Sequence, residues 1–140
     1  MTVRPIIDIS LAYLVATASL LLAACGTTTH YAPTNAPPGP MTAKPAHAVD
    51  VYTTSTPDVP FVEVGIIQSR QTSTLSMHDM PQIIAHMRKR AGHIGCDAVI
   101  INGIDNKTIT QIDELGKSTE SLDGYWGACI VYAPTEQAPG

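Results

Sequence analysis

The sequence predicts an α+β fold, in which a small mixed or antiparallel sheet of about four to five strands packs against one amphipathic helix. Three observations lead to this fold class: one long stripe of apolar residues at helical spacing, short β-branched runs before it, and two later runs whose apolar residues are continuous. A continuous apolar run is typical of a strand that is covered on both faces.

The helix is predicted over 80–94. Its apolar residues recur at i, i+3, i+4, i+7, i+11 and i+14, which places on one side of a helix Met80, Ile83, Ile84, Met87, Ala91 and Ile94. Ser76 and Asp79 have the spacing of a capping box, and Pro81 suits a first turn. Gly95 is a suitable helix end.

Strands are predicted around this helix from β-branched and apolar runs at 49–53, 61–67, 97–102 and 125–132. Residues 104–112 either extend the third strand or form another one. Gly65 indicates a bulge or a close backbone approach within its strand. Residues 114–124 are predicted to be a polar loop.

The first 24 residues are predicted to be a signal peptide. After Arg4, an apolar run of roughly 14 residues is too short for the ~20 that a membrane-spanning helix needs. The run ends in Leu22-Ala23-Ala24-Cys25. This motif resembles the bacterial lipobox, which implies cleavage before Cys25 and lipidation of its thiol by acyl chains such as palmitate. Gly26 in place of aspartate implies, by the same resemblance, export to the outer membrane.

Residues 25–47 are predicted to be the lipidated cysteine followed by a disordered tether. This segment has few large apolar side chains and is interrupted by Pro33, Pro37, Pro38, Pro40 and Pro45. The globular α+β domain is then expected over 48–133, followed by a disordered tail at 134–140.

Composition and motifs argue against several functions. The formal net charge is −4 and 14% of the residues are charged. No basic run is longer than 88–90, so nucleic acid is not an expected partner. No Gly-x-Ser-x-Gly elbow, phosphate loop or paired histidine–glutamate helix motif is present, so neither an enzyme nor a bound cofactor is expected.

Two cysteines, Cys96 and Cys129, follow Cys25. They form a disulfide if the fold brings their Cα atoms within about 7 Å, and the sequence leaves this open. His86, His93 and Cys96 are weak metal-ligand candidates, because i to i+7 places both histidines on similar sides of the helix. Surface histidines and a packed or disulfide-bonded cysteine are the favoured alternative.

The apolar surface around Trp126, Ile130 and Tyr132 is a candidate contact surface. One helix covers only one face of a sheet, whereas the later strands are apolar on both faces. These residues are therefore expected either to close against the polar loops or to dock another envelope protein.

The order of the elements and the sequence Gly95-Cys96-Asp97-Ala98-Val99-Ile100 resemble a group of small bacterial envelope domains. This group includes the Rcs stress-sensor outer-membrane lipoproteins and the envelope domains described as heavy-metal-binding. The resemblance implies a membrane-anchored, non-enzymatic binding or structural component of the envelope, with stress sensing as one role and periplasmic metal binding as the alternative. It implies an outer-membrane location that faces the periplasm or the cell surface.

Overall fold

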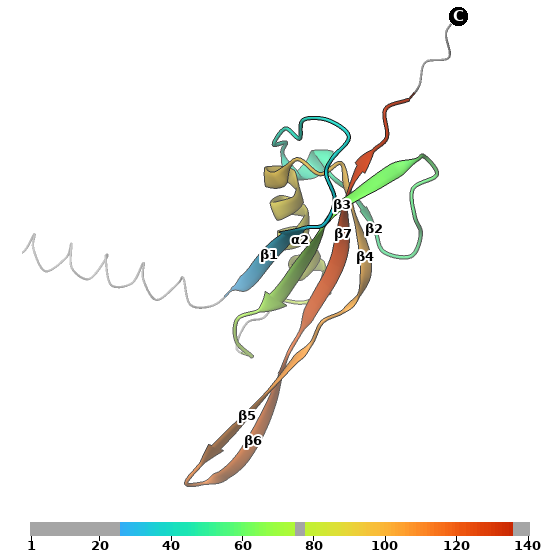
Figure 1. Ribbon diagram of the computed structural model, residues 1–140. Coiled ribbons are helices and arrows are strands. Elements are labelled where there is room, and N and C mark those ends of the chain that lie inside the picture. The colour runs from blue at the N-terminus through green and yellow to red at the C-terminus, as the bar shows by residue number, and fades with distance from the viewer. Residues whose placement is uncertain (1–25, 75–77, 136–140) are drawn as a thin grey trace, which may run out of the picture.

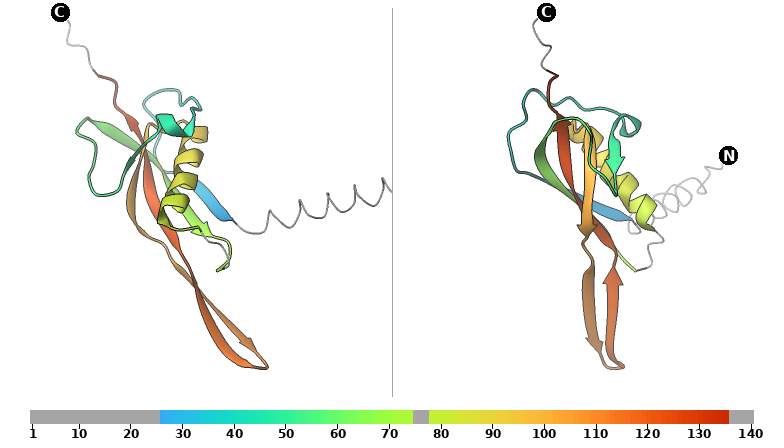
Figure 2. Two further views of the ribbon diagram at one scale, coloured as in Figure 1. Left: turned by 180° about the vertical axis from the view of Figure 1, so that it is seen from behind. Right: turned by 90° about the vertical axis from the view of Figure 1, so that its right-hand side faces the viewer.

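A computed structural model describes residues 26–74 and 78–135. A five-stranded mixed sheet carries one long helix on one face, and a two-stranded hairpin projects from one end (Figures 1 and 2). The predicted α+β class, with a small sheet packed against one amphipathic helix, is therefore confirmed.

The elements in chain order are β1 (Thr27–Pro33), the short 3-10 helix η2 (Ala46–Ala48), β2 (Asp50–Tyr52), β3 (Phe61–Gln71), α2 (Met80–Ile94), β4 (Ala98–Ile104), β5 (Lys107–Asp113), β6 (Gly116–Leu122) and β7 (Gly124–Tyr132). The strand order in the large sheet is β1-β3-β7-β4-β2, and β5 pairs with β6. The pair β2–β4 is parallel and the other pairs are antiparallel.

Helix α2 ends as predicted, but it begins at Met80, three residues later than a cap at Ser76 would place it. Asp79 and Gln82, not Ser76 and Asp79, form the reciprocal capping box. Ser76 lies outside the described residues. Pro81 stands in the first turn, and Gly95 ends the helix in the left-handed region at φ 100°.

The core lies on both faces of the sheet. The larger cluster, between α2 and the sheet, comprises Val49, Val64, Ile67, Met87, Ala91, Cys96, Val99 and Cys129. The smaller cluster on the opposite face comprises Ala98, Ala128 and Ile130. Strands β4 and β7 contribute to both clusters, which confirms that they are apolar on both faces.

Gly65 provides both features that the sequence indicated. The pairing of β3 with β7 shifts register between Glu63 and Gly65. A Cβ atom on Gly65 would also lie 2.3 Å from the ring of Tyr31, so only glycine admits this tyrosine.

The prediction of a disordered tether was wrong for residues 26–47. Strand β1 pairs along its whole length with β3, with Tyr31 opposite Ile67. Beyond β1, Lys44 N donates to the Gly92 carbonyl oxygen of α2 at 2.8 Å. Side chains alternate between the two sides of a strand, so only every second residue of β1 can face the core. Among these residues, Tyr31 is the large apolar side chain that packs against the larger core cluster. The globular unit therefore includes residues 26–47 and is not limited to the residues from 48 onward.

Replacing Gly92 by alanine is expected to lower the free energy of unfolding by about 1–3 kcal/mol, because the new Cβ would lie 2.5 Å from the Lys44 carbonyl oxygen. Helix propensity alone predicts a gain of roughly 1 kcal/mol. The sign of the change in the free energy of unfolding, measured with urea, therefore shows whether the segment that contains Lys44 is docked on α2 or disordered. Exposed Ala85 on the same helix is the control, since Ala85→Gly should cost only its propensity, about 1 kcal/mol. A stabilising alanine at position 92 would contradict the docking.

Candidate functional site

The amino end of β1 is where the predicted lipid would be attached. Cys25 and the predicted signal peptide 1–24 lie outside the described residues, as does 136–140 of the predicted tail. Gly26 is already held in the fold, since its N–H donates to Thr72 Oγ1 at 3.1 Å and its carbonyl accepts from Thr72 N at 3.0 Å. A lipid on Cys25 would therefore join the domain without a spacer. Within the described ranges, no helix combines the length and apolar character needed to cross a bilayer.

Cys96 and Cys129 form a disulfide, and their Cα atoms lie 5.7 Å apart. Cys129 stands in β7 opposite Val99 of β4. Cys96 precedes β4, in the turn that follows Gly95, and from there it reaches Cys129 within the helix-facing core. Both cysteines are fully buried.

The metal-ligand candidates His86, His93 and Cys96 do not form a site. The sulfur of Cys96 is committed to the disulfide, whereas metal binding requires a free thiolate. Across residues 26–74 and 78–135, no three or more His, Cys, Asp or Glu side chains are grouped as metal ligands. His86 lies instead against His78, with ring centroids 5.3 Å apart.

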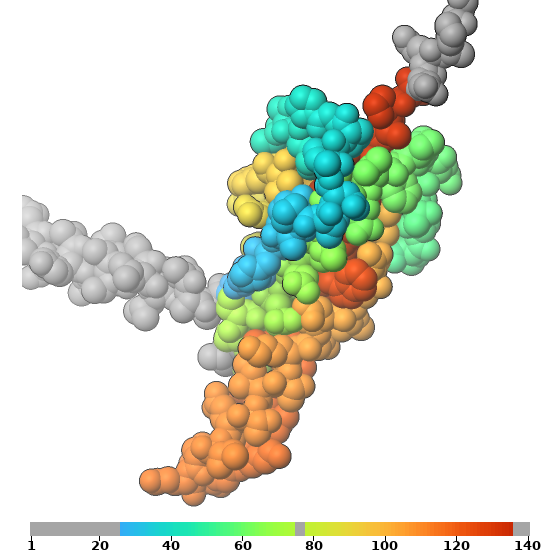
Figure 3. All heavy atoms as spheres, in the orientation of Figure 1, coloured from blue at the N-terminus to red at the C-terminus, as the bar shows by residue number. Residues whose placement is uncertain are grey.

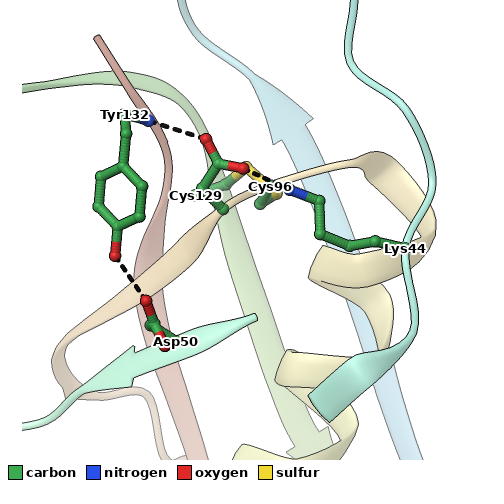
Figure 4. A network of polar contacts seen from close by, with 6 residues as sticks. Lys44, Asp50, Cys96, Cys129 and Tyr132 are labelled. Atoms are coloured by element: carbon green, nitrogen blue, oxygen red, sulfur yellow. Dashed lines mark hydrogen bonds and ion pairs between the residues drawn. A yellow bond between two sulfur atoms is a disulfide. The ribbon is translucent and has the colours of Figure 1, made fainter. Parts of the chain in front are cut away.

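A polar network joins the segment before η2, strand β2 and the carboxyl end of β7 near the disulfide (Figure 4). One carboxylate oxygen of Asp97 pairs with Lys44 Nζ, and the other accepts from Tyr132 N at 2.9 Å. The Tyr132 hydroxyl donates to Asp50 Oδ2 at 2.8 Å and lies 3.1 Å from the Tyr52 hydroxyl. These groups are partners of one another, so the network connects the three segments and stabilises the fold.

Stability is expected to fall as the pH rises above about 10. Burial, followed by hydrogen bonds with Tyr52 and Asp50, raises the pKa of Tyr132 above its ordinary value. The unfolded chain releases this proton near pH 10 while the folded chain keeps it, so the contribution is fully present below that pH and is lost as the pH rises. Tyr132→Phe should flatten the dependence in urea unfolding between roughly pH 9 and 11. If the stability of Tyr132→Phe falls equally steeply with pH, the pH dependence comes from other groups.

A shallow groove with basic side chains lies between β1 and α2 and has a volume of about 240 Å³. Its lining residues are Thr27, Thr29, His86, Lys89, Arg90 and His93. The neighbouring His78 at the start of the helix has its Nδ1 2.7 Å from Thr27 Oγ1. Burial, then the nearby His78 and Lys89, lowers the pKa of His86. Lys89 and Arg90 are the lysine and arginine side chains of the groove.

The hairpin of β5 and β6 corrects the prediction of a polar loop over 114–124. The further strand expected within 104–112 is largely β5, which pairs along its length with β6. The hairpin projects from the body as a narrow arm (Figure 3). Near its tip Ile112 is 81% exposed and Leu115 is 99% exposed. The available sequence signal was Gly116, which follows the two-residue turn 114–115 directly and has φ 134°.

The second face of the sheet is closed at its centre. Ile130 is fully buried, with Tyr52, Ile100 and Tyr132 packed around its cluster. Trp126 and Tyr132 are half-buried. Ile130 is thus covered by side chains of the neighbouring strands and not by the polar loops that were expected, and the hairpin tip is a more exposed apolar surface than Trp126 or Tyr132.

No family model matches this chain, and no curated protein matches it. Among solved structures, the chain is similar to the Francisella virulence factor FvfA, with 16% sequence identity and a TM-score of 0.43. The likeness covers 74% of this chain and 97% of that chain.

Proposed function

We propose that this chain is a membrane-anchored bacterial lipoprotein that serves as a non-enzymatic binding or structural component of the cell envelope. The lipid on Cys25 holds it in the outer membrane, with the domain facing the periplasm. The observation that carries the proposal is the motif Leu22-Ala23-Ala24-Cys25, which is followed directly by Gly26, a residue that Thr72 already holds in the fold.

The disulfide supports export to an oxidising compartment. Disulfides persist in the periplasm and on cell surfaces and are rare where thiols are kept reduced. The Cys96–Cys129 bond joins the start of β4 to β7 in the core. A metal-binding function, the alternative expected from the sequence, loses its thiol ligand to this bond and is not proposed.

The projecting hairpin supports a binding role toward another envelope protein. Within the described part of the chain, β5 and β6 pair only with each other. Nearly all residues of the hairpin are exposed, so it buries little apolar surface of its own and a partner that covers it is favourable. Ile112 and Leu115 offer apolar contacts at the tip. A stress-sensing role of such a complex is motivated by the resemblance to the Rcs group.

The anchoring is tested by growing cells that produce the chain with labelled palmitate and by separating their membranes. We expect wild-type chain to carry the label and to remain with the outer membrane. Cys25→Ser should carry no label and keep its leader, whereas the matched variant Cys96→Ser should still be labelled. Equal labelling of wild type and Cys25→Ser would refute acylation at this residue.

The binding role is tested by photo-crosslinking in living cells. A photoreactive residue at Leu115 is expected to yield a defined adduct with an envelope protein, whereas one at exposed Asp58, in the loop between β2 and β3, is not. The same adducts from both positions, or none from Leu115, would remove the hairpin as the binding surface.

A further inference from the structure

The point of lipid attachment lies beside the basic groove. Thr27 lines the groove and is two residues after Cys25, a span of at most roughly 7 Å. The amino ends of β1 and α2 lie side by side in all three ribbon views (Figures 1 and 2). Acyl chains buried in a bilayer would therefore hold the groove close to the lipid headgroups.

The hairpin excludes an upright orientation on the membrane. It leaves the body at the end where β1 begins and points away from the carboxyl end of β7 (Figure 1). Its 7-residue strands are about 23 Å long, more than the ~15 Å of hydrocarbon in one leaflet. The charged side chains along it, which disfavour entry into hydrocarbon, are Lys107, Asp113, Glu114, Lys117 and Glu120. The domain must therefore lie on its side, and β1 is the edge strand nearest the anchor.

The charges beside this edge are positive although the whole chain carries −4. Helix α2 contains no Asp or Glu. Arg88 is engaged within the fold, donating to the carbonyls of Val49 and His47 at 2.6 and 3.2 Å. The ion pairs of the described residues are Lys44–Asp97 and Arg70–Asp105, so the exposed Lys89 and Arg90 are available to an external anion.

We infer that the domain rests on the membrane through the groove between β1 and α2, with Lys89 and Arg90 contacting the phosphates of anionic phospholipid headgroups. This inference rests on the proposed acylation of Cys25. The acyl chains supply the affinity, and the two cations set the orientation. Each cation near an anionic surface favours contact about fivefold, so both together favour this orientation about 30-fold.

The test uses the acylated mature chain on the outer face of preformed vesicles, made either of phosphatidylcholine or of a mixture with phosphatidylglycerol. Lysines are acetylated by a water-soluble reagent and quantified by mass spectrometry, with Lys89 as the reporter and Lys117 of β6 as the internal reference. On anionic vesicles Lys89 should react at least fivefold more slowly, relative to Lys117, than on neutral ones. Arg90→Glu should lose most of this protection, and Lys107→Glu on the hairpin should keep it.

Equal reactivity of Lys89 on both kinds of vesicle, with the chain still bound, would overturn the headgroup contact and leave the acylation intact. A further sample contains inorganic phosphate with neutral vesicles at matched ionic strength. It tests whether the groove binds the free phosphate ion and not the phosphate of a lipid headgroup. Protection of Lys89 by phosphate alone would indicate a site for the free ion and would also overturn the inference. A chain that leaves the vesicles because Cys25 carries no lipid would refute the proposed function and, with it, this inference.

Discussion

Breaking the Cys96–Cys129 disulfide lowers the free energy of unfolding by about 3–4 kcal/mol. The two cysteines are 33 residues apart, and a crosslink closing a loop of that size restricts the unfolded chain by roughly this amount. This is a large part of the 5–15 kcal/mol that is typical of a single domain. Urea unfolding of the oxidised and the reduced wild-type chain measures the effect.

The double variant Cys96→Ala/Cys129→Ala separates the crosslink from packing. Both side chains are fully buried, so their removal costs the crosslink and also leaves space in the core. The variant should therefore be less stable than the reduced wild type. A loss below about 1 kcal/mol on reduction would mean that the bond does not restrain the unfolded chain as the loop length predicts.

Met87→Ala is expected to cost about 2–5 kcal/mol, because it removes a large side chain from the centre of the contact between α2 and the sheet. Met87 is 0% exposed and belongs to the larger core cluster. Surrounding side chains relax only partly into the space, so the cost exceeds that of lost hydrophobic transfer alone. Thermal or urea unfolding measures it.

Met80→Ala is the matched control on the same helix and the same apolar stripe. Met80 is 43% exposed, so its truncation should change stability by less than about 1 kcal/mol. The helical periodicity treats the two methionines alike, and only the structure separates them. Similar losses for both variants would contradict the packing of α2 on the sheet.

Features with a local cause were predictable from the sequence. The apolar stripe from Met80 to Ile94 and Gly95 gave the helix and its end, because periodicity and a left-handed cap depend on neighbouring residues. The continuous apolar runs in β4 and β7 likewise revealed that both faces are covered. Gly65 indicated a bulge or a close approach because an isolated glycine in a strand often marks one of these features.

The features that were missed depend on contacts between distant residues or on exposure. β1 pairs with residues about forty positions later, as Thr29 with Ser69, and its prolines concealed it. β6 is exposed on both sides except at Leu122, so it shows no alternation of apolar and polar residues. Whether Cys96 and Cys129 pair depends on where the turn after α2 lies in three dimensions, and the sequence does not show this. Of the proposed site, the sequence indicated Cys25 as the residue to be lipidated, but it did not indicate the basic groove between β1 and α2.

The most direct test of the account is the mass of the amino-terminal peptide of the chain extracted from membranes. We expect this peptide to begin at Cys25, to carry a diacylglyceryl group on the thiol, and to continue directly into Gly26 and β1. A chain that begins at Met1, or a Cys25 without acyl chains, would contradict the anchoring and the membrane contact that follows from it.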